Sequence, residues 1–308
     1  MSDKSALFKE DFILKSPEFR VGANGRYLAC TLINKALGEF PAKKWETDSF
    51  DDEVVKLGIA KVTGQYDIYK GKKQVVIKKL EQTSREWKEL VTYVVEMADL
   101  WAELISAAGK ISRDNLRAFV LKMLEDNKKN LMIWPAAKSI HHAIVGGLLL
   151  HTMEVVRVAM AMVASIKTTA DPDICIAGAI LHDIGKLKEF SVRMGQGDYT
   201  VDGSVLGHAL MGIEMVKSAA KDLPAQDFYH LQFIIASHHG KKEWGALSEP
   251  ATTESMIVHL ADLASAKISK INTVITLENN DDSPWTEFDQ SLGVRALKKI
   301  PTEYPCAQ

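Results

Sequence analysis

The sequence predicts a multi-domain α+β protein in which a small N-terminal β-barrel precedes an all-α helical bundle. Residues 26–80 form short alternating runs separated by glycine-containing turns, whereas apolar residues recur at helical spacing from Thr83 onward. Residues 1–80 carry 15 Lys and Arg against 11 Asp and Glu, and the remainder carries 23 against 29. A basic module on an acidic body is expected where the module meets an anionic ligand.

Strands are expected over residues 26–34, 39–45, 54–69 and 74–80, with a hairpin turn at Lys70–Lys73 (KGKK). Four or five strands within eighty residues indicate a small barrel or sandwich. The five-stranded oligonucleotide-binding (OB) barrel is the most common fold of that size, so residues 1–80 are assigned to an OB-fold domain.

Helices are expected from the capping-box sequence at Thr83–Glu86 and again from about Ser112 to the polar stretch 126–130. Residues 81–138 are therefore interpreted as a helical connector, residues 139–276 as an all-helical domain and residues 277–308 as a loop-like tail. The predicted helices of the third segment cover about 142–166, 172–183, 205–219, 227–239 and 253–275.

Composition agrees with a folded cytoplasmic protein. Apolar residues make up 46% and charged residues 25% of the chain, and the three cysteines form no CxxC motif. The longest apolar run, 143–150, is far shorter than the roughly 20 residues that a membrane span needs. The N-terminus mixes both charge signs and does not resemble a signal peptide.

The histidines indicate the chemistry, because all nine lie at or after His141. With two aspartates they form a series near predicted helix middles and ends, which one helical bundle can bring together. Imidazole with carboxylate is a ligand set for Mn, Fe, Co, Ni or Zn. A lone histidine is more often a core or surface residue, but burying seven such groups without a metal would leave several unsatisfied, at about 1–3 kcal/mol each. The predicted metal ligands are His151, His182, Asp183, His208, His238, His239 and Asp262.

The spacing of His151, His182-Asp183 and Asp262 resembles the HD superfamily of metal-dependent phosphohydrolases. Over about residues 11–275 the chain is similar to the YhaM-type 3'-5' exoribonucleases, which join an N-terminal OB barrel to a C-terminal HD domain. The motifs that carry this resemblance are 148–152 (LLLHT), 182–186 (HDIGK), 207–208 (GH), 237–240 (SHHG) and 261–262 (AD).

The resemblance implies one ion held by His151, His182, Asp183 and Asp262, and another held by Asp183, His208, His238 and His239. Asp183 would bridge the ions, with a hydroxide between them as the nucleophile. Lys186 would contact a phosphate oxygen, although its position alone fits a solvated helix-end lysine equally well. The expected cofactor is one or two divalent ions, Mn²⁺ by resemblance, and no other cofactor is indicated.

Other positions near these motifs allow two interpretations each. Gly146-Gly147 lies inside a predicted helix, either to leave space for substrate or for tight helix packing. His141 and His142 either line a substrate channel or begin a helix. Glu154 and His259 are either partners that orient the ligands or ordinary surface or core residues.

The barrel offers candidate nucleic-acid-binding residues on the strand face opposite Leu28. Aromatic side chains on such a face stack bases while cations follow the backbone. A solvated, charged hairpin is the alternative, and the five acids in residues 46–53 should repel nucleic acid from part of the barrel. The candidates are Tyr27, Lys43, Trp45, Tyr69, Lys72 and Lys73.

Together these features predict a metal-dependent 3'-5' exonuclease of single-stranded RNA, with DNA as a further substrate, that releases nucleoside 5'-monophosphates. Polarity and product follow from the resemblance alone. Two alternatives stay open: an HD hydrolase of small nucleotides, such as a cyclic dinucleotide or nucleoside triphosphate, and a non-catalytic single-strand-binding protein. No membrane partner is expected, and the sequence leaves a homo-oligomer open.

Overall fold

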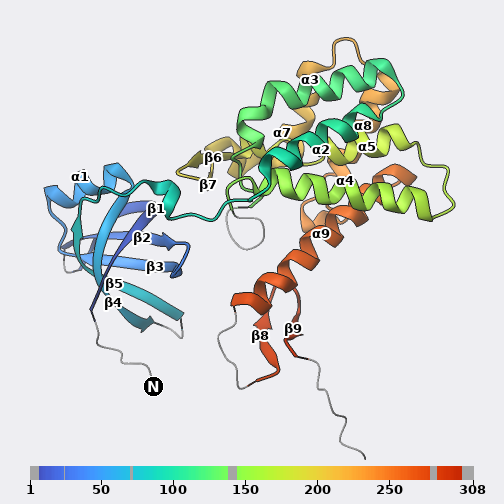
Figure 1. The fold of residues 1–308 in the computed structure, drawn as a ribbon. Helices are drawn as coiled ribbons and strands as arrows, with labels where there is room; N and C mark the ends of the chain where they lie inside the picture. The colour runs from blue at the N-terminus through green and yellow to red at the C-terminus, as the bar shows by residue number, and fades with distance from the viewer. Residues whose placement is uncertain (1–6, 24, 70–71, 138–143, 278–282, 300–308) are drawn as a thin grey trace, which may run out of the picture. The chain divides into compact units, whose positions relative to one another are not determined.

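The structure is a computed structural model that describes residues 7–23, 25–69, 72–137, 144–277 and 283–299 (Figure 1). It divides into two compact units. The first comprises Met1–Tyr93 with Val192–Asp198, and the second comprises Val94–Ser191 with Tyr199–Gln308. His141, His142 and the first two residues of the predicted hairpin turn lie outside the described residues.

The first unit is a closed, OB-like barrel with the strand order β1-β2-β3-β5-β4. β1 is long enough to pair with both β2 and β4, and β3 pairs in parallel with β5, which closes the barrel. Inward-facing side chains such as Phe12, Leu28 and Leu32 are fully buried in its core. The strands are β1 Phe8–Gly22, β2 Gly25–Asn34, β3 Gly38–Trp45, β4 Ile59–Tyr69 and β5 Lys72–Glu81.

The expected strand over 54–69 is wrong at its start, because α1 (Ser49–Leu57) occupies the connection between β3 and β4. Asp48 caps this helix through a reciprocal pair of hydrogen bonds with Asp51. Asp51 also lies 2.8 Å from Lys44 Nζ, and Asp52 pairs with Arg26. Part of the acidic stretch therefore caps a helix and forms ion pairs rather than facing solvent unpaired.

The helix expected from Thr83 is also wrong. The Thr83 hydroxyl caps only a local turn by accepting from Arg85 N, and a single 3-10 turn follows at Trp87–Glu89. The first helix of the connector is α2 (Met97–Gly109), and α3 (Asp114–Leu131) follows close to its expected position. Leu90 and Val94 have helical spacing, but their backbone groups bond to distant parts of the chain instead. Lys35 N donates to Leu90 O over 2.8 Å, and Val94 N donates to Val145 O over 3.1 Å.

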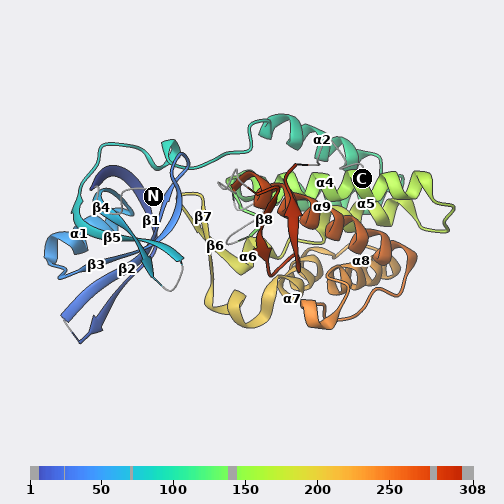
Figure 2. The same cartoon turned by 90° about the horizontal axis from the view of Figure 1, so that it is seen from below.

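The second unit is built around a helical bundle with one continuous core. α4 packs against α5 and α9, and α7 packs against α8 (Figure 2). The interpretation of residues 139–276 as all-helical missed the hairpin β6–β7, and the loop-like tail contains the hairpin β8–β9. The elements that follow α3 along the chain are α4 Gly147–Ser165, α5 Pro172–Leu181, α6 Lys186–Glu189, β6 Phe190–Arg193, β7 Gln196–Tyr199, α7 Val201–Ala219, α8 Ala225–Ser237, α9 Thr253–Leu277, β8 Trp285–Asp289 and β9 Val294–Leu297. Most of the β6–β7 hairpin, Val192–Asp198, belongs to the first unit.

The start of α4 differs from the expected helix over 142–166. Gly146 is the residue before the helix and has a positive φ of 81°, which favours glycine. A Cβ at this position would lie 2.3 Å from Met97 Sδ, so the glycine allows tight packing against α2. By length and apolar composition α4 is the one described helix that would suffice to span a bilayer, but half of that stretch is buried inside the unit, as for a core helix.

Candidate metal centre

Five separate segments of the second unit bring the seven predicted ligands together. His151 lies on α4, His182-Asp183 directly follows α5, and His208 lies on α7. The pair 238–239 follows α8, and Asp262 lies on α9. Two groups have ligand atoms within 4.8 Å of one another, namely His151 with His182 and Asp262, and His208 with His238 and His239.

Two glycines place His208. Gly207 interrupts α7 with φ 71° and ψ 158°, so the helix changes direction one residue before the imidazole. Gly185 lies directly against this kink, because a Cβ built on it would approach His208 O to 1.9 Å and Gly212 N to 2.5 Å. The Gly185 of the HDIGK motif therefore allows close backbone contact between the motif and α7.

Asp183 lies at the middle of the cluster and presents one oxygen to each group. Its Oδ2 is 3.3 Å from His151 Nε2 and 3.4 Å from His182 Nε2. Its Oδ1 is 3.4 Å from His208 Nε2 and 3.6 Å from His238 Nε2. Asp262 Oδ1 adds a second carboxylate to the first group, 3.2 Å from His151 Nε2. This arrangement fits a carboxylate shared between two cations.

The Nδ1 atoms of four histidines are held by hydrogen bonds that decide which nitrogen carries the proton. His182 donates to Ala179 O and His238 donates to Ile235 O, both over 2.8 Å. A carbonyl oxygen can only accept, so the proton of each neutral ring is on Nδ1. His208 Nδ1 likewise donates to the Glu189 carboxylate over 3.1 Å.

His151 is oriented through a hydroxyl. The Ser265 hydroxyl donates its proton to Glu154 Oε2 over 2.6 Å, and Ser265 Oγ itself lies 2.9 Å from His151 Nδ1. Because the Ser265 proton is already directed to a carboxylate, the His151 ring must donate its Nδ1 proton to this oxygen. Glu154, Ser265 and His151 thus form a chain that orients the ring, as partners of metal-binding histidines do.

The result is a convergence of imidazole Nε2 atoms at short distances from one another. His151 Nε2 and His182 Nε2 are 3.3 Å apart, and His208 Nε2 and His239 Nε2 are 3.0 Å apart. Buried His238 Nε2 and His239 Nδ1 have no hydrogen-bond partner in the described part of the chain. Lone pairs that face each other and a carboxylate repel unless a proton or a metal ion lies between them, so the donor set fits divalent cations.

The proton affinities agree with this conclusion. Burial opposes the charged form of His151, but hydrogen bonds to Asp183 and Asp262 outweigh burial and raise its pKa to about 9. Burial and the neighbouring rings of His238 and His208 lower the pKa of His239 to about 3. Although burial opposes ionisation, the His151 hydrogen bond holds the pKa of Asp262 below its usual range. The carboxylates are therefore ionised. They hold a proton on the His151 ring, at the place where a cation would otherwise lie, whereas the His239 ring stays neutral.

Lys186 lies on the shared carboxylate, with its Nζ 2.6 Å from Asp183 Oδ2 and only 16% of its side chain exposed. The solvated-lysine interpretation is therefore wrong. Burial alone would lower the pKa of Lys186, but the Asp183 charge outweighs it and raises the pKa. The ammonium group stays charged within reach of any anion at the cluster.

Several residues of the centre escaped the sequence reading. Glu189 and Ser265 hold two of the rings, and each lies three residues after a predicted site residue on the same helix, a spacing that places both on one face. His259 donates from Nδ1 to His238 O over 2.7 Å, so it positions the chain rather than a ligand ring. Glu189 and Ser265 could have been found by a search for hydrogen-bond acceptors at helical spacing from the predicted site residues.

On the barrel, the structure brings four of the candidate nucleic-acid-binding residues together in one aromatic face, which comprises Tyr27, Lys43, Trp45 and Tyr69. Tyr27 is directly opposite Trp45 in the β2–β3 ladder, and their ring centroids are 4.8 Å apart. Lys43 Nζ lies 6.0 Å from the Tyr27 ring and 5.6 Å from each of the other two rings. Three exposed or half-exposed rings around one ammonium form a platform suited to bases and phosphates.

Lys73 is not part of this aromatic face. Its Nζ lies 3.9 Å from the Tyr66 ring centroid and 5.0 Å from that of Phe40, in a second aromatic cluster. Lys72 pairs through its backbone with Tyr69, and its side chain lies outside the described residues.

Comparison with known proteins agrees with this architecture. The HD domain family matches residues 148–267. The chain is 28% identical to 3'-5' exoribonuclease YhaM of Bacillus subtilis and 29% identical to that of Bacillus licheniformis, over 93% of both chains in each case. It is 29% identical to the Listeria welshimeri protein of the same name, over 85% of this chain and 86% of the relative. No solved structure matches the chain significantly. The chain is thus a homologue of the YhaM proteins along nearly its whole length, with an OB-like barrel followed by an HD domain.

Proposed function

We propose that this protein is a divalent-metal-dependent 3'-5' exoribonuclease that shortens single-stranded RNA and releases nucleoside 5'-monophosphates. The observation that carries the proposal is the pair of Asp183 oxygens, each facing a separate set of imidazole Nε2 atoms. The hydrolase class, the RNA substrate and the 3'-5' polarity are taken from the YhaM homologues.

One cation would be held by His151, His182, Asp183 and Asp262, and the other by Asp183 with His208, His238 and His239. Bound there, divalent ions supply Lewis-acid activation of water and neutralise charge on a phosphodiester. Mn²⁺ is the ion that we propose, on the resemblance to the YhaM-type exoribonucleases. The donor set by itself suits Mn, Fe, Co, Ni or Zn, since it contains no thiolate.

The protein's own groups complete the centre. Lys186 places a buried positive charge next to the shared carboxylate, where it can bind a non-bridging phosphate oxygen. The Nδ1 hydrogen bonds keep the rings of His151, His182, His208 and His238 oriented, with Nε2 towards the place where a cation would lie. A cavity of about 160 Å³, which Lys186, Asp183 and Asp262 help to line, leaves room for water beside the cluster.

Strand binding is assigned to residues 1–80 and hydrolysis to residues 139–276, with 81–138 as connector and 277–308 as a C-terminal tail. The barrel would hold the strand through the aromatic face, where Lys43 lies among three rings. Base stacking does not discriminate strongly among sequences, so little sequence preference is expected.

A time course on 5'-labelled single-stranded RNA and DNA, with Mn²⁺ or with chelator, tests the proposal. We expect an RNA ladder that shortens from the 3' end with Mn²⁺ and stops with chelator. Cleavage only of mononucleotides or dinucleotides would instead indicate a small-nucleotide hydrolase, and binding without turnover would indicate a single-strand-binding protein. Equal degradation of DNA would widen the substrate class without changing the chemistry.

A further inference from the structure

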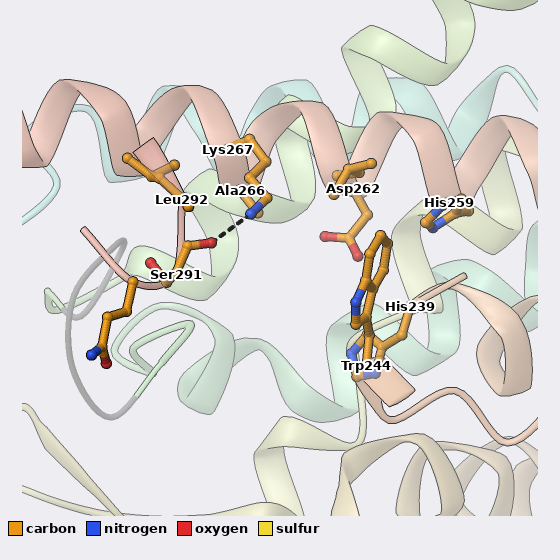
Figure 3. Close-up of a pocket in the computed structure, with 11 residues that line it drawn as sticks. His239, Trp244, His259, Asp262, Ala266, Lys267, Ser291 and Leu292 are labelled. Carbon is orange, nitrogen blue, oxygen red and sulfur yellow. Dashed lines mark hydrogen bonds between the residues drawn. The ribbon is translucent and has the colours of Figure 1, made fainter. Parts of the chain in front are cut away.

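A second cavity adjoins the metal centre within the helical unit (Figure 3). Its volume of about 470 Å³ falls in the range of roughly 300–1,000 Å³ that is typical of small-ligand pockets. It lies between α9, the segment after α8 and the turn that joins β8 to β9. The lining residues are His239, Trp244, His259, Asp262, Leu263, Ala266, Lys267, Gln290, Ser291, Leu292 and Gly293.

One wall is the Trp244 indole, which is 53% exposed although it lies beside the half-buried His239 and the carboxylate of Asp262 (Figure 3). Lys241 Nζ lies 5.0 Å from the centroid of this ring. An exposed aromatic ring next to a cation and an apolar wall is the combination that stacks a nucleobase.

The opposite wall is the β8–β9 turn, which is firmly held. Asp289 Oδ1 accepts hydrogen bonds from Ser291 N and Leu292 N over 2.9 and 3.0 Å. Its other oxygen lies 2.9 Å from Lys270 Nζ on α9, and Lys267 Nζ donates to Ser291 O over 2.8 Å (Figure 3). Two lysines of α9 therefore tie the turn to the helix that carries Asp262.

This cavity and the smaller one at the metal centre share His239, Asp262 and Ala266. A phosphodiester bound at the shared carboxylate would therefore have one of its two nucleotides next to Trp244. The β8–β9 turn forms the wall of the cavity on the side away from Asp262. A volume of about 470 Å³ suits one nucleotide rather than several, as the end of a strand would require.

We propose that this cavity, the Trp244 pocket, binds the 3'-terminal nucleotide of the substrate, with the base stacked on Trp244 and the ribose towards the β8–β9 turn. The assignment rests on the proposed exoribonuclease function and adds to it the residue that recognises the leaving nucleotide. It also gives the tail hairpin a role, as the wall that stops the strand end.

The test is the affinity of the full-length protein, with Mn²⁺, for adenosine 5'-monophosphate and for ribose 5-phosphate, measured by calorimetry. We expect Trp244→Ala to weaken binding of the nucleotide by about 5- to 100-fold, because one stacked base is lost. Binding of ribose 5-phosphate should be unchanged, because it lacks a base. Trp244→Phe should keep most of the nucleotide affinity. The matched control Trp285→Ala, an exposed tryptophan on β8 that does not line the pocket, should keep all of it.

Three outcomes would overturn the pocket assignment. The wild-type protein could bind both ligands equally, Trp244→Ala could leave nucleotide binding intact, or it could weaken both ligands to the same degree. None of them depends on RNA cleavage. If the protein fails to shorten RNA but still prefers the nucleotide through Trp244, the exonuclease proposal is wrong and the pocket assignment stands. If it shortens RNA but lacks this preference, the pocket assignment is wrong and the exonuclease proposal stands.

Discussion

The metal centre and the aromatic face of the barrel are built in opposite ways. His182, Asp183 and His238 are at most 3% exposed, come from the ends of two helices far apart in the sequence, and are each held by hydrogen bonds or ion contacts. Trp45 and Tyr69 are about half exposed and reach one surface simply because strand residues alternate. The centre therefore requires fixed geometry, whereas the face tolerates adjustment. Substitutions should be severe in the first region and graded in the second.

The largest effect is expected for Asp183→Asn, which keeps the shape of the side chain but removes the charge shared by both ligand groups. RNA hydrolysis should fall by about 10³-fold or more, as when a preorganised charge is lost from an active site. The measurement is the initial rate on labelled RNA with saturating Mn²⁺. Asp202→Asn, an exposed aspartate on α7, is the control and should behave as wild type. A loss of less than tenfold would mean that Asp183 is not central.

Gly185→Ala should be the next most damaging change, although it adds a single methyl group. The new Cβ would lie 1.9 Å from His208 O, so the kinked segment of α7 must move away and take the imidazole with it. We expect a loss of about 1–3 kcal/mol in the free energy of unfolding, as for overpacked cores, together with a lower hydrolysis rate.

The matched control is Gly109→Ala, at an exposed helix end where nothing lies within 4 Å of the new Cβ. This variant should be neutral or slightly more stable, because alanine favours helix. Thermal unfolding of the two variants side by side checks the prediction. Equal stability would mean that the backbone contact at Gly185 is not rigid.

Ser265→Ala tests whether orientation of a ligand ring matters as much as the ligand itself. The variant removes the hydroxyl that links Glu154 to His151, and the ring keeps its Nε2 but loses the acceptor for its Nδ1 proton. A 10- to 100-fold loss in metal affinity is expected from such outer partners. Titration with Mn²⁺ measures it. Ser218→Ala, which removes an exposed hydroxyl on α7, should leave the affinity within twofold of wild type. An unchanged affinity in Ser265→Ala would break the comparison between a rigid centre and an adaptable face.

The contrast between the metal centre and the aromatic face also explains which parts of the fold and the site could be predicted from the sequence. Alternation placed Tyr27, Lys43 and Trp45 on one face correctly, because register depends only on neighbouring positions. The ligand series was visible because imidazoles and carboxylates are uncommon in apolar helices. Closure of the barrel by β1 was not visible, since it depends on pairing between distant strands. α1 was missed although the residues that cap it, Asp48 and Asp51, are close in sequence.

The residues that orient the centre were hidden for a different reason. Glu189 and Ser265 are ordinary polar residues, and only the distance from a particular ring nitrogen gives them a role. Trp244 lies in the segment after α8, and the β8–β9 turn lies in the tail. Both segments have weak periodicity, so tertiary contacts rather than local pattern decide their structure. Local rules therefore located the ligands but not the groups around them.

Trp45→Ala should have a smaller effect than any change at the centre. The ring stacks on Tyr27 and is exposed, so its loss removes one platform for a base but leaves the barrel core intact. Affinity for single-stranded RNA should fall by about 5- to 100-fold, mainly as a rise in KM. Fluorescence anisotropy with labelled RNA measures this loss. Phe50→Ala, an exposed aromatic on α1 of the same unit, should bind RNA as wild type does. A similar loss in both variants would mean that the aromatic face has no special role.

The smallest expected effect separates charge from stacking on the same face. Lys43 Nζ lies among three rings, so Lys43→Gln removes one positive charge while the rings stay in place. For a single strand, each phosphate neutralised contributes about 0.7 to the slope of log affinity against log salt, so the slope should shrink by about that amount. At low salt the affinity should fall severalfold, and at high salt the variant and the wild type should converge. Lys56→Gln, on the exposed side of α1, should keep the wild-type slope. If the slope in Lys43→Gln also stays unchanged, the ammonium serves only to pack the rings, and strand binding on this face depends on stacking alone.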